Sequence, residues 1–265
     1  MGPFRYITRN IGGGEEYRKL VVKSYATVPA LVMTKAFKYA RQGTVERARG
    51  HYEESLRYFL EGSAVWGDRV RGLANASVVR VNDFEPEPMG SLVFINHVCE
   101  LDFPFDSLVL KLPYLANQEI KNSVFAYWWM RAMGSEVFDR RDSRTIATSV
   151  RNLVARLNDT SFIVYPEGGL SYSEELKPLK KGMVRIAHEN RIPIHVIIKS
   201  GLTALLEGHP APVIAYSSAG VVDPGDFADW KALREELTAR FREGKAKLDS
   251  TLQTELQSDP LHQAQ

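Results

Sequence analysis

His97 and Asp102 are the residues of this chain best suited to acid–base chemistry. They follow residues 92–96, a short apolar run rich in β-branched side chains that predicts a buried strand. In α/β enzymes the site lies beyond the carboxyl ends of such strands. An imidazole titrates near neutral pH and can take a proton from a hydroxyl, while a carboxylate can orient the ring and stabilise the imidazolium. The pair therefore predicts a general base with a supporting carboxylate.

The five-residue spacing between His97 and Asp102 constrains the backbone. On a straight helix, at about 100° per residue, the two side chains would lie about 140° apart. The chain must therefore turn between them if they are to meet. Two alternatives stay open: His97 is a polar residue that merely ends a strand, or Cys99 beside it acts as the nucleophile of a thioesterase.

Three further blocks follow in order along the chain. They are Gly134-Ser135-Glu136-Val137-Phe138-Asp139-Arg140, then Phe162-Ile163-Val164-Tyr165-Pro166-Glu167-Gly168-Gly169 with Lys180-Lys181-Gly182 after it, and Ile192-Pro193-Ile194-His195-Val196. Together with His97-x4-Asp102, and in the same order and spacing, these blocks resemble the four motifs of the lysophosphatidic acid and glycerol-3-phosphate acyltransferase superfamily. The resemblance covers roughly residues 90 to 200.

The resemblance implies an O-acyltransferase that takes a fatty acyl group from coenzyme A or acyl carrier protein and needs no cofactor or metal. His97 would be the base that deprotonates the hydroxyl of a lysolipid, and Asp102 would hold its imidazole. The leading acceptor is 1-acylglycerol-3-phosphate, which would give phosphatidic acid. The substrate-binding residues implied are Arg140, Glu167, Gly168, Gly169 and Lys181. The amides of the two glycines could also bind the oxyanion.

Two departures from the family pattern bear on the acceptor. Gly169-Leu170 stands where the family commonly shows Thr-Arg, and Asn117 stands where it often has a lysine before the second block. Lys180 or Lys181 could compensate for these missing cations. Otherwise the acceptor is another lysolipid, an amino-acid lipid or a glycolipid. A hydrolase that uses water at the same site, or a lipid-binding member without turnover, are the alternatives from other functional classes.

The composition is that of an ordinary globular protein. Lipid partners are implied by the resemblance, and nucleic-acid binding has no support beyond the basic first third. One cysteine excludes an intramolecular disulfide framework and fits a reducing compartment. We expect no secretory signal, since the first twenty residues lack an apolar core with a cleavage site, and no membrane span, since no run of about 18 apolar residues occurs. Residues 1–80 hold 14 Lys or Arg against 7 Asp or Glu. This basic third predicts peripheral contact with the cytoplasmic side of a membrane.

The hydrophobic periodicity predicts an α/β fold, a mixed sheet flanked by helices after a basic two-helix element. The two helices are expected at 15–40 and 44–72, with Thr44 as an N-cap and Pro29 as a break. Strands are expected at 77–81, 92–96, 108–115, 137–138, 161–165, 193–199 and 213–216, and helices at 123–133, 143–157, 182–190 and 226–252. We therefore expect a membrane-contacting element at 1–75, an acyltransferase domain at 76–255 and a disordered tail at 256–265.

Overall fold

A computed structural model describes residues 11–87, 89–118, 124–139 and 141–258 of the chain. Its centre is a five-stranded sheet in the order β1-β7-β6-β2-β5. The strands are β1 (Ser77–Arg80), β2 (Leu92–Ile95), β5 (Phe162–Val164), β6 (Ile194–Ser200) and β7 (Val213–Val222). All neighbours are parallel except β6 and β7. A second, parallel pair joins β3 (Leu115–Asn117) to β4 (Glu136–Phe138). The predicted mixed α/β sheet is confirmed.

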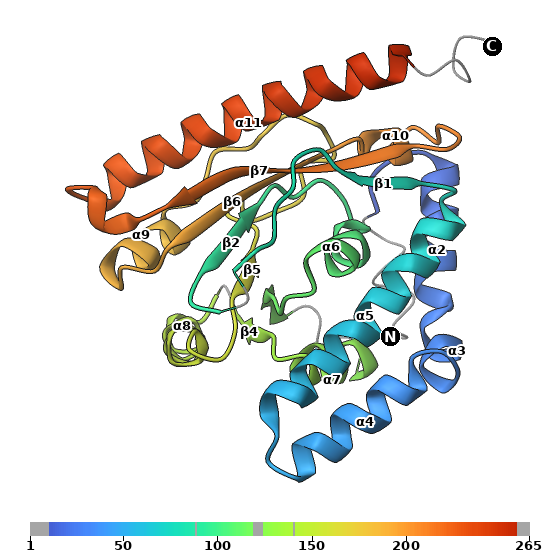
Figure 1. Cartoon of the computed structure of the whole chain (residues 1–265), viewed down its shortest axis with the longest axis horizontal. Helices are drawn as coiled ribbons and strands as arrows, with labels where there is room; N and C mark the ends of the chain where they lie inside the picture. Colours follow the sequence, from blue (N-terminus) through green and yellow to red (C-terminus); the bar gives the residue numbers. More distant parts are fainter. Residues whose placement is uncertain (1–10, 88, 119–123, 140, 259–265) are drawn as a thin grey trace.

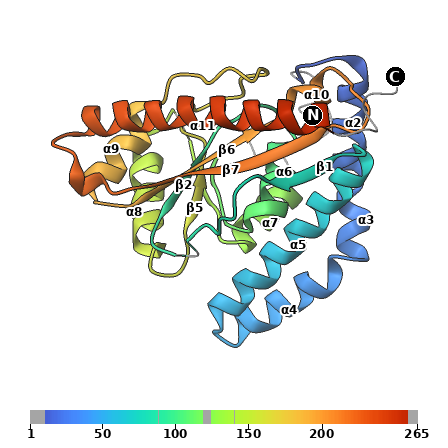
Figure 2. The ribbon, with the colours of Figure 1, turned by 45° about the horizontal axis from the view of Figure 1, so that its top comes forward.

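Helices cover both faces of the large sheet, which explains why its central strands are mostly apolar. Helix α11 (Trp230–Ser258) lies along one face, and α5 (Tyr52–Leu73) and α6 (Asp102–Leu110) lie on the other (Figures 1 and 2). The side chains of β2 alternate between these faces. Leu92 and Phe94 join the cluster that includes α11, while Val93 and Ile95 join the cluster that includes α6. Strand β2 is therefore buried on both sides and ends next to α6.

From residue 11 onward, the described part of the amino-terminal segment forms four helices where two were expected. They are α2 (Glu15–Ala26), α3 (Val28–Met33), α4 (Phe37–Ala48) and α5. The predicted boundary at 41–43 is wrong, because α4 runs through it. Gly43 serves packing: a Cβ there would lie 2.7 Å from the ring of Phe59 on α5. Thr44 is not an N-cap, since its hydroxyl donates to the carbonyl of Ala40 within α4. Pro29 does accompany a break, in the first turn of α3.

The predicted strand at 108–115 is also wrong for most of its length. Residues as far as Leu110 belong to α6, and only Leu115 lies in a strand, β3. A short apolar run fits a buried helix as well as a strand, and Asp102 in the first turn favours the helix. Lys111 then ends α6 in a left-handed conformation, with φ of 49°.

The remaining elements follow the expected order. They are α7 (Val124–Ala132), α8 (Ser143–Arg156), α9 (Lys181–Glu189), α10 (Thr203–Leu206) and the short helix η2 (Pro224–Asp226). Asp142 caps α8 by accepting a hydrogen bond from the amide of Arg144. Helix α11 ends at Ser258. The rest of the tail predicted at 256–265, residues 259–265, lies outside the described residues.

The amino-terminal helices pack onto the α/β part rather than standing apart from it. Side chains of α2, α4 and α5 share one buried cluster with side chains of β2 and α6. The Tyr17 phenol of α2 donates to Glu100, which lies just before α6. Within the described residues no single helix is long and apolar enough to cross a membrane, although the bent pair Glu15–Met33 and Phe37–Ala48 passes that test of length and composition together.

Gly67 sets the distance between α5 and α6, and its replacement by alanine is expected to destabilise the protein. A Cβ at Gly67 would lie 2.3 Å from the carbonyl oxygen of Pro104 in α6, so the two helices must separate. Overpacking of this kind costs about 1–3 kcal/mol. Gly72→Ala is the matched control, since nothing lies within 4 Å of its Cβ position in the same helix. Urea unfolding should show Gly67→Ala destabilised and Gly72→Ala unchanged or stabilised; equal midpoints would contradict this packing.

Candidate active site

His97 and Asp102 meet where β2 gives way to α6. Strand β2 ends at Ile95, the chain turns, and Asp102 is the first residue of α6. The His97 Nδ1 and Asp102 Oδ2 atoms lie 2.6 Å apart. The same carboxylate oxygen accepts the backbone N–H of Val98 at 2.6 Å and that of Cys99 at 3.3 Å. The turn required by the five-residue spacing is therefore present, and the carboxylate itself holds it closed.

The environment of Asp102 keeps it charged although it is fully buried. Burial alone would raise the pKa of Asp102, but the Lys199 ammonium and the hydrogen bond with His97 together lower it. An ionised Asp102 accepts a hydrogen bond from Nδ1–H, so Nε2 is the nitrogen left to act as an acceptor. The His97 side chain is 21% exposed, which leaves it accessible to a substrate. The pair is thus arranged as a general base with an orienting carboxylate.

The ring of Tyr165 covers one face of the His97 imidazole. The two ring centroids are 3.8 Å apart and the planes differ by 7°, a stacked arrangement. Tyr165 follows β5, the strand next to β2. Its phenol donates to Asp106 Oδ2 at 2.7 Å. The stacking restricts rotation of the imidazole. Tyr165 belongs to the third sequence block, but the sequence did not predict this role for it.

Glu167 joins two loops at the edge of the site. Its carboxylate accepts the backbone N–H of His97 at 2.9 Å through Oε1 and that of Lys177 at 2.7 Å through Oε2. The residue is buried, at 3% exposed, and this burial raises its pKa while the two N–H donors oppose the rise. The resemblance implied that Glu167 binds the substrate, whereas these two contacts favour a role in bracing the site.

The two glycines after Glu167 differ in what surrounds them. Gly168 has a φ of +71° and donates its amide to the Tyr165 carbonyl, and a Cβ there would contact Lys180 at 3.1 Å. Nothing lies within 4 Å of the Cβ position of Gly169. Lys180 lines the neighbouring pocket, whereas Lys181 is exposed at the start of α9 and does not. Arg140, the residue expected to bind a phosphate, lies outside the described residues.

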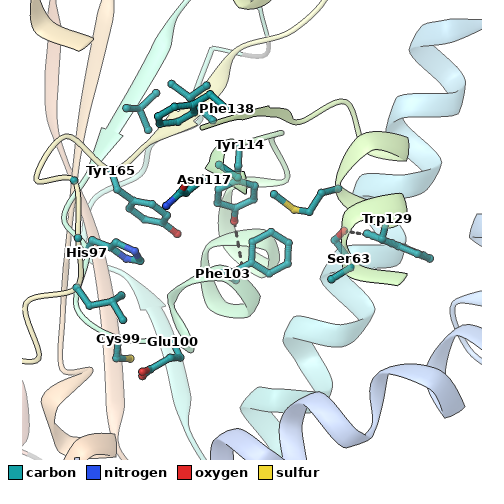
Figure 3. A pocket seen from close by; sticks show the side chains of 18 of the residues that line it. Ser63, His97, Cys99, Glu100, Phe103, Tyr114, Asn117, Trp129, Phe138 and Tyr165 are labelled. Atoms are coloured by element: carbon teal, nitrogen blue, oxygen red, sulfur yellow. Dashed lines mark hydrogen bonds between the residues drawn. The ribbon is translucent and has the colours of Figure 1, made fainter. Parts of the chain in front are cut away.

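A pocket of about 1140 Å³ opens beside His97. Figure 3 shows the imidazole and Tyr165 on one side of it, and Trp129 with Ser63 on the other. The Trp129 indole donates to the Ser63 hydroxyl at 2.8 Å. The walls are mostly apolar and come from both the amino-terminal helices and the α/β part, from Val28 in α3 to Ile186 in α9. Such a pocket can enclose a long apolar group next to the His–Asp pair.

Cys99 and His195 show no arrangement for catalysis. Burial, followed by the charge of Asp102, raises the pKa of Cys99 well above its ordinary value, so its thiolate is disfavoured. This disfavours the thioesterase alternative in which Cys99 is the nucleophile. His195 is 4% exposed and its Nε2 lies 2.7 Å from the Ser218 hydroxyl, as expected of a packed core residue.

The fold and this site place the chain among α/β enzymes whose catalytic groups follow a central strand. Residues 78–199 match the family model described as Acyltransferase. This segment of the chain, residues 78–199, is therefore similar to the acyltransferase family.

Two known proteins resemble the chain. The 1-acyl-sn-glycerol-3-phosphate acyltransferase of Saccharomyces cerevisiae is 30% identical over 97 residues, which are 34% of this chain and 31% of the yeast protein. The chain thus matches about a third of that curated relative. The crystal structure of the 1-acyl-sn-glycerophosphate (LPA) acyltransferase PlsC from Thermotoga maritima superposes with a TM-score of 0.71 and 20% identity, covering 87% of this chain and 95% of that one. At this identity the structural match establishes the shared fold.

Proposed function

We propose that the chain transfers a fatty acyl group from an acyl thioester to the hydroxyl of a lysolipid, with 1-acylglycerol-3-phosphate as the leading acceptor and phosphatidic acid as product. The observation that carries the proposal is the His97–Asp102 pair, 2.6 Å apart, at the wall of an apolar pocket of about 1140 Å³. The similarity of residues 78–199 to the acyltransferase family supports acyl transfer, and the yeast relative is named for this acceptor.

The chemistry requires one base and no covalent acyl-enzyme. His97 Nε2 takes the proton of the acceptor hydroxyl as its oxygen attacks the thioester carbonyl carbon. The carbon–sulfur bond then breaks, and the imidazolium gives the proton to the leaving thiolate, which becomes the free thiol of coenzyme A or of acyl carrier protein. Asp102 stabilises the imidazolium between these steps. The amide of Gly169 is our candidate for the oxyanion, because the space around this residue is open and the Gly168 amide is bonded to Tyr165.

The polar groups of the pocket also favour a second class of acceptor. Of the described residues that line it, Lys180 is the one lysine or arginine, while Glu100 contributes a carboxylate and Asn117 an amide. The Glu100 carboxylate accepts from the phenols of Tyr17 and Tyr172. A negative group there opposes a phosphate and would suit a lysolipid with an amine or hydroxyl headgroup. Among the alternative acceptors, this observation favours an amino-acid lipid or a glycolipid over another lysophospholipid.

Thiol release from acyl-coenzyme A and acyl carrier protein, measured with a panel of lysolipids, tests the proposal. Release that requires one lysolipid, with its diacyl product seen by mass spectrometry, would support acyl transfer and identify the acceptor. Release without any acceptor would indicate a thioesterase at the same site. Absence of release with both donors and every acceptor would favour a lipid-binding function.

Asn117→Lys is expected to improve the use of a phosphate-bearing acceptor. Asn117, in β3, lines the pocket, so a lysine there would add an ammonium where the headgroup is proposed to bind. Charge-assisted hydrogen bonds contribute about 1.5–3 kcal/mol, part of which the desolvation of lysine offsets. We expect kcat/KM for 1-acylglycerol-3-phosphate to rise roughly 3- to 30-fold, and kcat/KM for uncharged monoacylglycerol to stay unchanged. Equal changes in kcat/KM for the two acceptors would indicate that the headgroup does not bind beside Asn117.

We further propose that the amino-terminal helices contact the cytoplasmic face of a membrane. Met33 and Phe37, between α3 and α4, are 79% and 55% exposed, and Lys35 and Lys38 lie beside them. An apolar group flanked by cations suits an anionic bilayer surface. The proposed division into residues 1–75, which contact the membrane, and 76–255, which catalyse, follows from this arrangement. Binding to vesicles with and without anionic lipid tests it, with Met33→Ser/Phe37→Ser as the variant expected to bind more weakly.

A further inference from the structure

Behind the His97–Asp102 pair lies a buried group of charges that the proposed mechanism does not use. Lys199, the sixth residue of β6, and Asp106, on α6, are both fully buried. The Lys199 Nζ atom lies 3.2 Å from Asp102 Oδ1. It also lies 3.0 Å from Asp106 Oδ1 and 2.7 Å from Asp106 Oδ2. One ammonium therefore bridges the carboxylate that holds His97 and a second carboxylate one helical turn further along α6.

The position of Lys199 is fixed by the sheet. The side-chain amide of Asn96, at the end of β2, accepts the backbone N–H of Lys199 at 2.9 Å and donates to its carbonyl at 3.0 Å. These two bonds hold β6 beside the residue that precedes His97. The Lys199 ammonium has little freedom to move away from the catalytic pair.

Asp106 also reaches His97 by a second path, through Tyr165. Both of its oxygens accept phenol hydrogen bonds, from Tyr216 at 2.8 Å and from Tyr165 at 2.7 Å. Tyr165 is the residue stacked on the His97 imidazole. Asp106 is therefore connected to His97 along two paths. One runs through Lys199 and Asp102 to the edge of the imidazole, and the other runs through Tyr165 to the face of the ring.

The titratable groups around the Lys199 ammonium come from several elements. They are Asp102 and Asp106 from α6, Cys99 from the turn before it, Tyr165 after β5, and Tyr216 from β7. Burial raises the pKa of Cys99, Tyr165 and Tyr216 well above their ordinary values, so these three stay neutral. The charges of the group are therefore those of the lysine and the two aspartates.

The pKa directions agree with an ammonium held between carboxylates. Burial alone would lower the pKa of Lys199, but Asp102 and Asp106 raise it above its ordinary value. Burial, with a smaller contribution from Asp102, raises the pKa of Asp106, and Lys199 opposes that rise. A buried ion pair adds little net stability compared with apolar residues of the same volume, so its location beside a catalytic pair points to function.

We propose that Lys199 and Asp106 are positioning residues that set the proton affinity of the His97–Asp102 pair, Lys199 lowering it and Asp106 raising it. This assignment rests on the proposed function for its catalytic meaning. The effect of the two charges on proton binding by His97 does not depend on which acceptor is used. Opposite charges must act in opposite directions on the proton that His97 binds.

The test is titration of His97, followed by NMR of its ring carbon–hydrogen signal, with assignment by comparison with His97→Ala. Asp106→Asn removes a negative charge while keeping the shape of the side chain, and should move the midpoint of the titration to lower pH. Lys199→Met removes the positive charge and should move that midpoint to higher pH. Lys199→Met/Asp106→Asn, which removes both charges, should return the titration close to that of the wild type.

The double variant and Asp106→Asn keep the test decisive if Lys199→Met alone fails to fold. Asp68→Asn, at an exposed site on α5, is the matched control and should leave the titration unchanged. In the acyltransfer assay the acid limb of the kcat/KM profile should shift in the same order. If wild type proves inactive, the proposed function fails while the NMR titration still decides this inference. An unchanged titration in Asp106→Asn, or shifts of the same sign in Asp106→Asn and Lys199→Met, would overturn it.

Discussion

Asp102→Asn is expected to lower kcat for acyl transfer by about 10²–10³-fold, most of what a positioned general base contributes, because the carboxylate acts through His97. Asparagine fits the space, but its amide group cannot make all the hydrogen bonds that the carboxylate makes. If its oxygen faces His97 and the amide of Val98, its NH₂ group faces the Lys199 ammonium, which lies 3.2 Å from Asp102 Oδ1. If it is flipped, the NH₂ group faces Nδ1 and favours the tautomer that carries its proton on Nε2. In that tautomer His97 cannot accept the proton of the acceptor.

Measurement of kcat and KM at saturating lysolipid checks this prediction. The KM for the acyl donor should change much less than kcat, because Asp102 is fully buried and does not line the pocket. Asp159→Asn, at an exposed position after α8, is the control and should be as active as wild type. A loss of less than about tenfold in Asp102→Asn would mean that the carboxylate does not orient the base.

The sequence predicted the sheet better than the helices around it. Strands β2, β5 and β6 are buried on both faces, so each is a nearly continuous apolar run with a clear end. Gly43 was misinterpreted because a glycine that allows two helices to approach looks the same in sequence as one that ends a helix. Residues 108–110 were misassigned because a short apolar run does not distinguish a strand from a buried helix.

In the site, a contact between residues close in sequence could be predicted, whereas a contact between residues far apart in sequence could not. His97 and Asp102 could be paired from sequence because five residues separate them, and their distance of 2.6 Å agrees with that pairing. Lys199 and Asp106 are 93 positions apart, and only the fold brings them together. One signal was present: a lysine inside the apolar run of β6 needs a buried partner. Asp106, four residues after Asp102 and on the same helical face, was the carboxylate to consider.

His97→Ala is expected to lower kcat by about 10³-fold, within the range of 10²–10⁴ that a positioned general base contributes. The alanine leaves Asp102 in place, bonded to the backbone of Val98 and Cys99 and next to Lys199, so the turn should persist. Binding of the acyl donor should also persist, since the pocket beside His97 is mostly apolar and remains intact. His209→Ala is the matched control, because this histidine is exposed and pairs with Glu207 on the surface.

The measurement that tests the central claim most directly is lysolipid-dependent ester formation from an acyl thioester, compared between wild type, His97→Ala and His209→Ala. Thiol and ester should appear in equal amounts with wild type and His209→Ala, and both should fall together by about 10³-fold in His97→Ala. Ester formation by His97→Ala at a rate near that of wild type would contradict the assignment of His97 as the base.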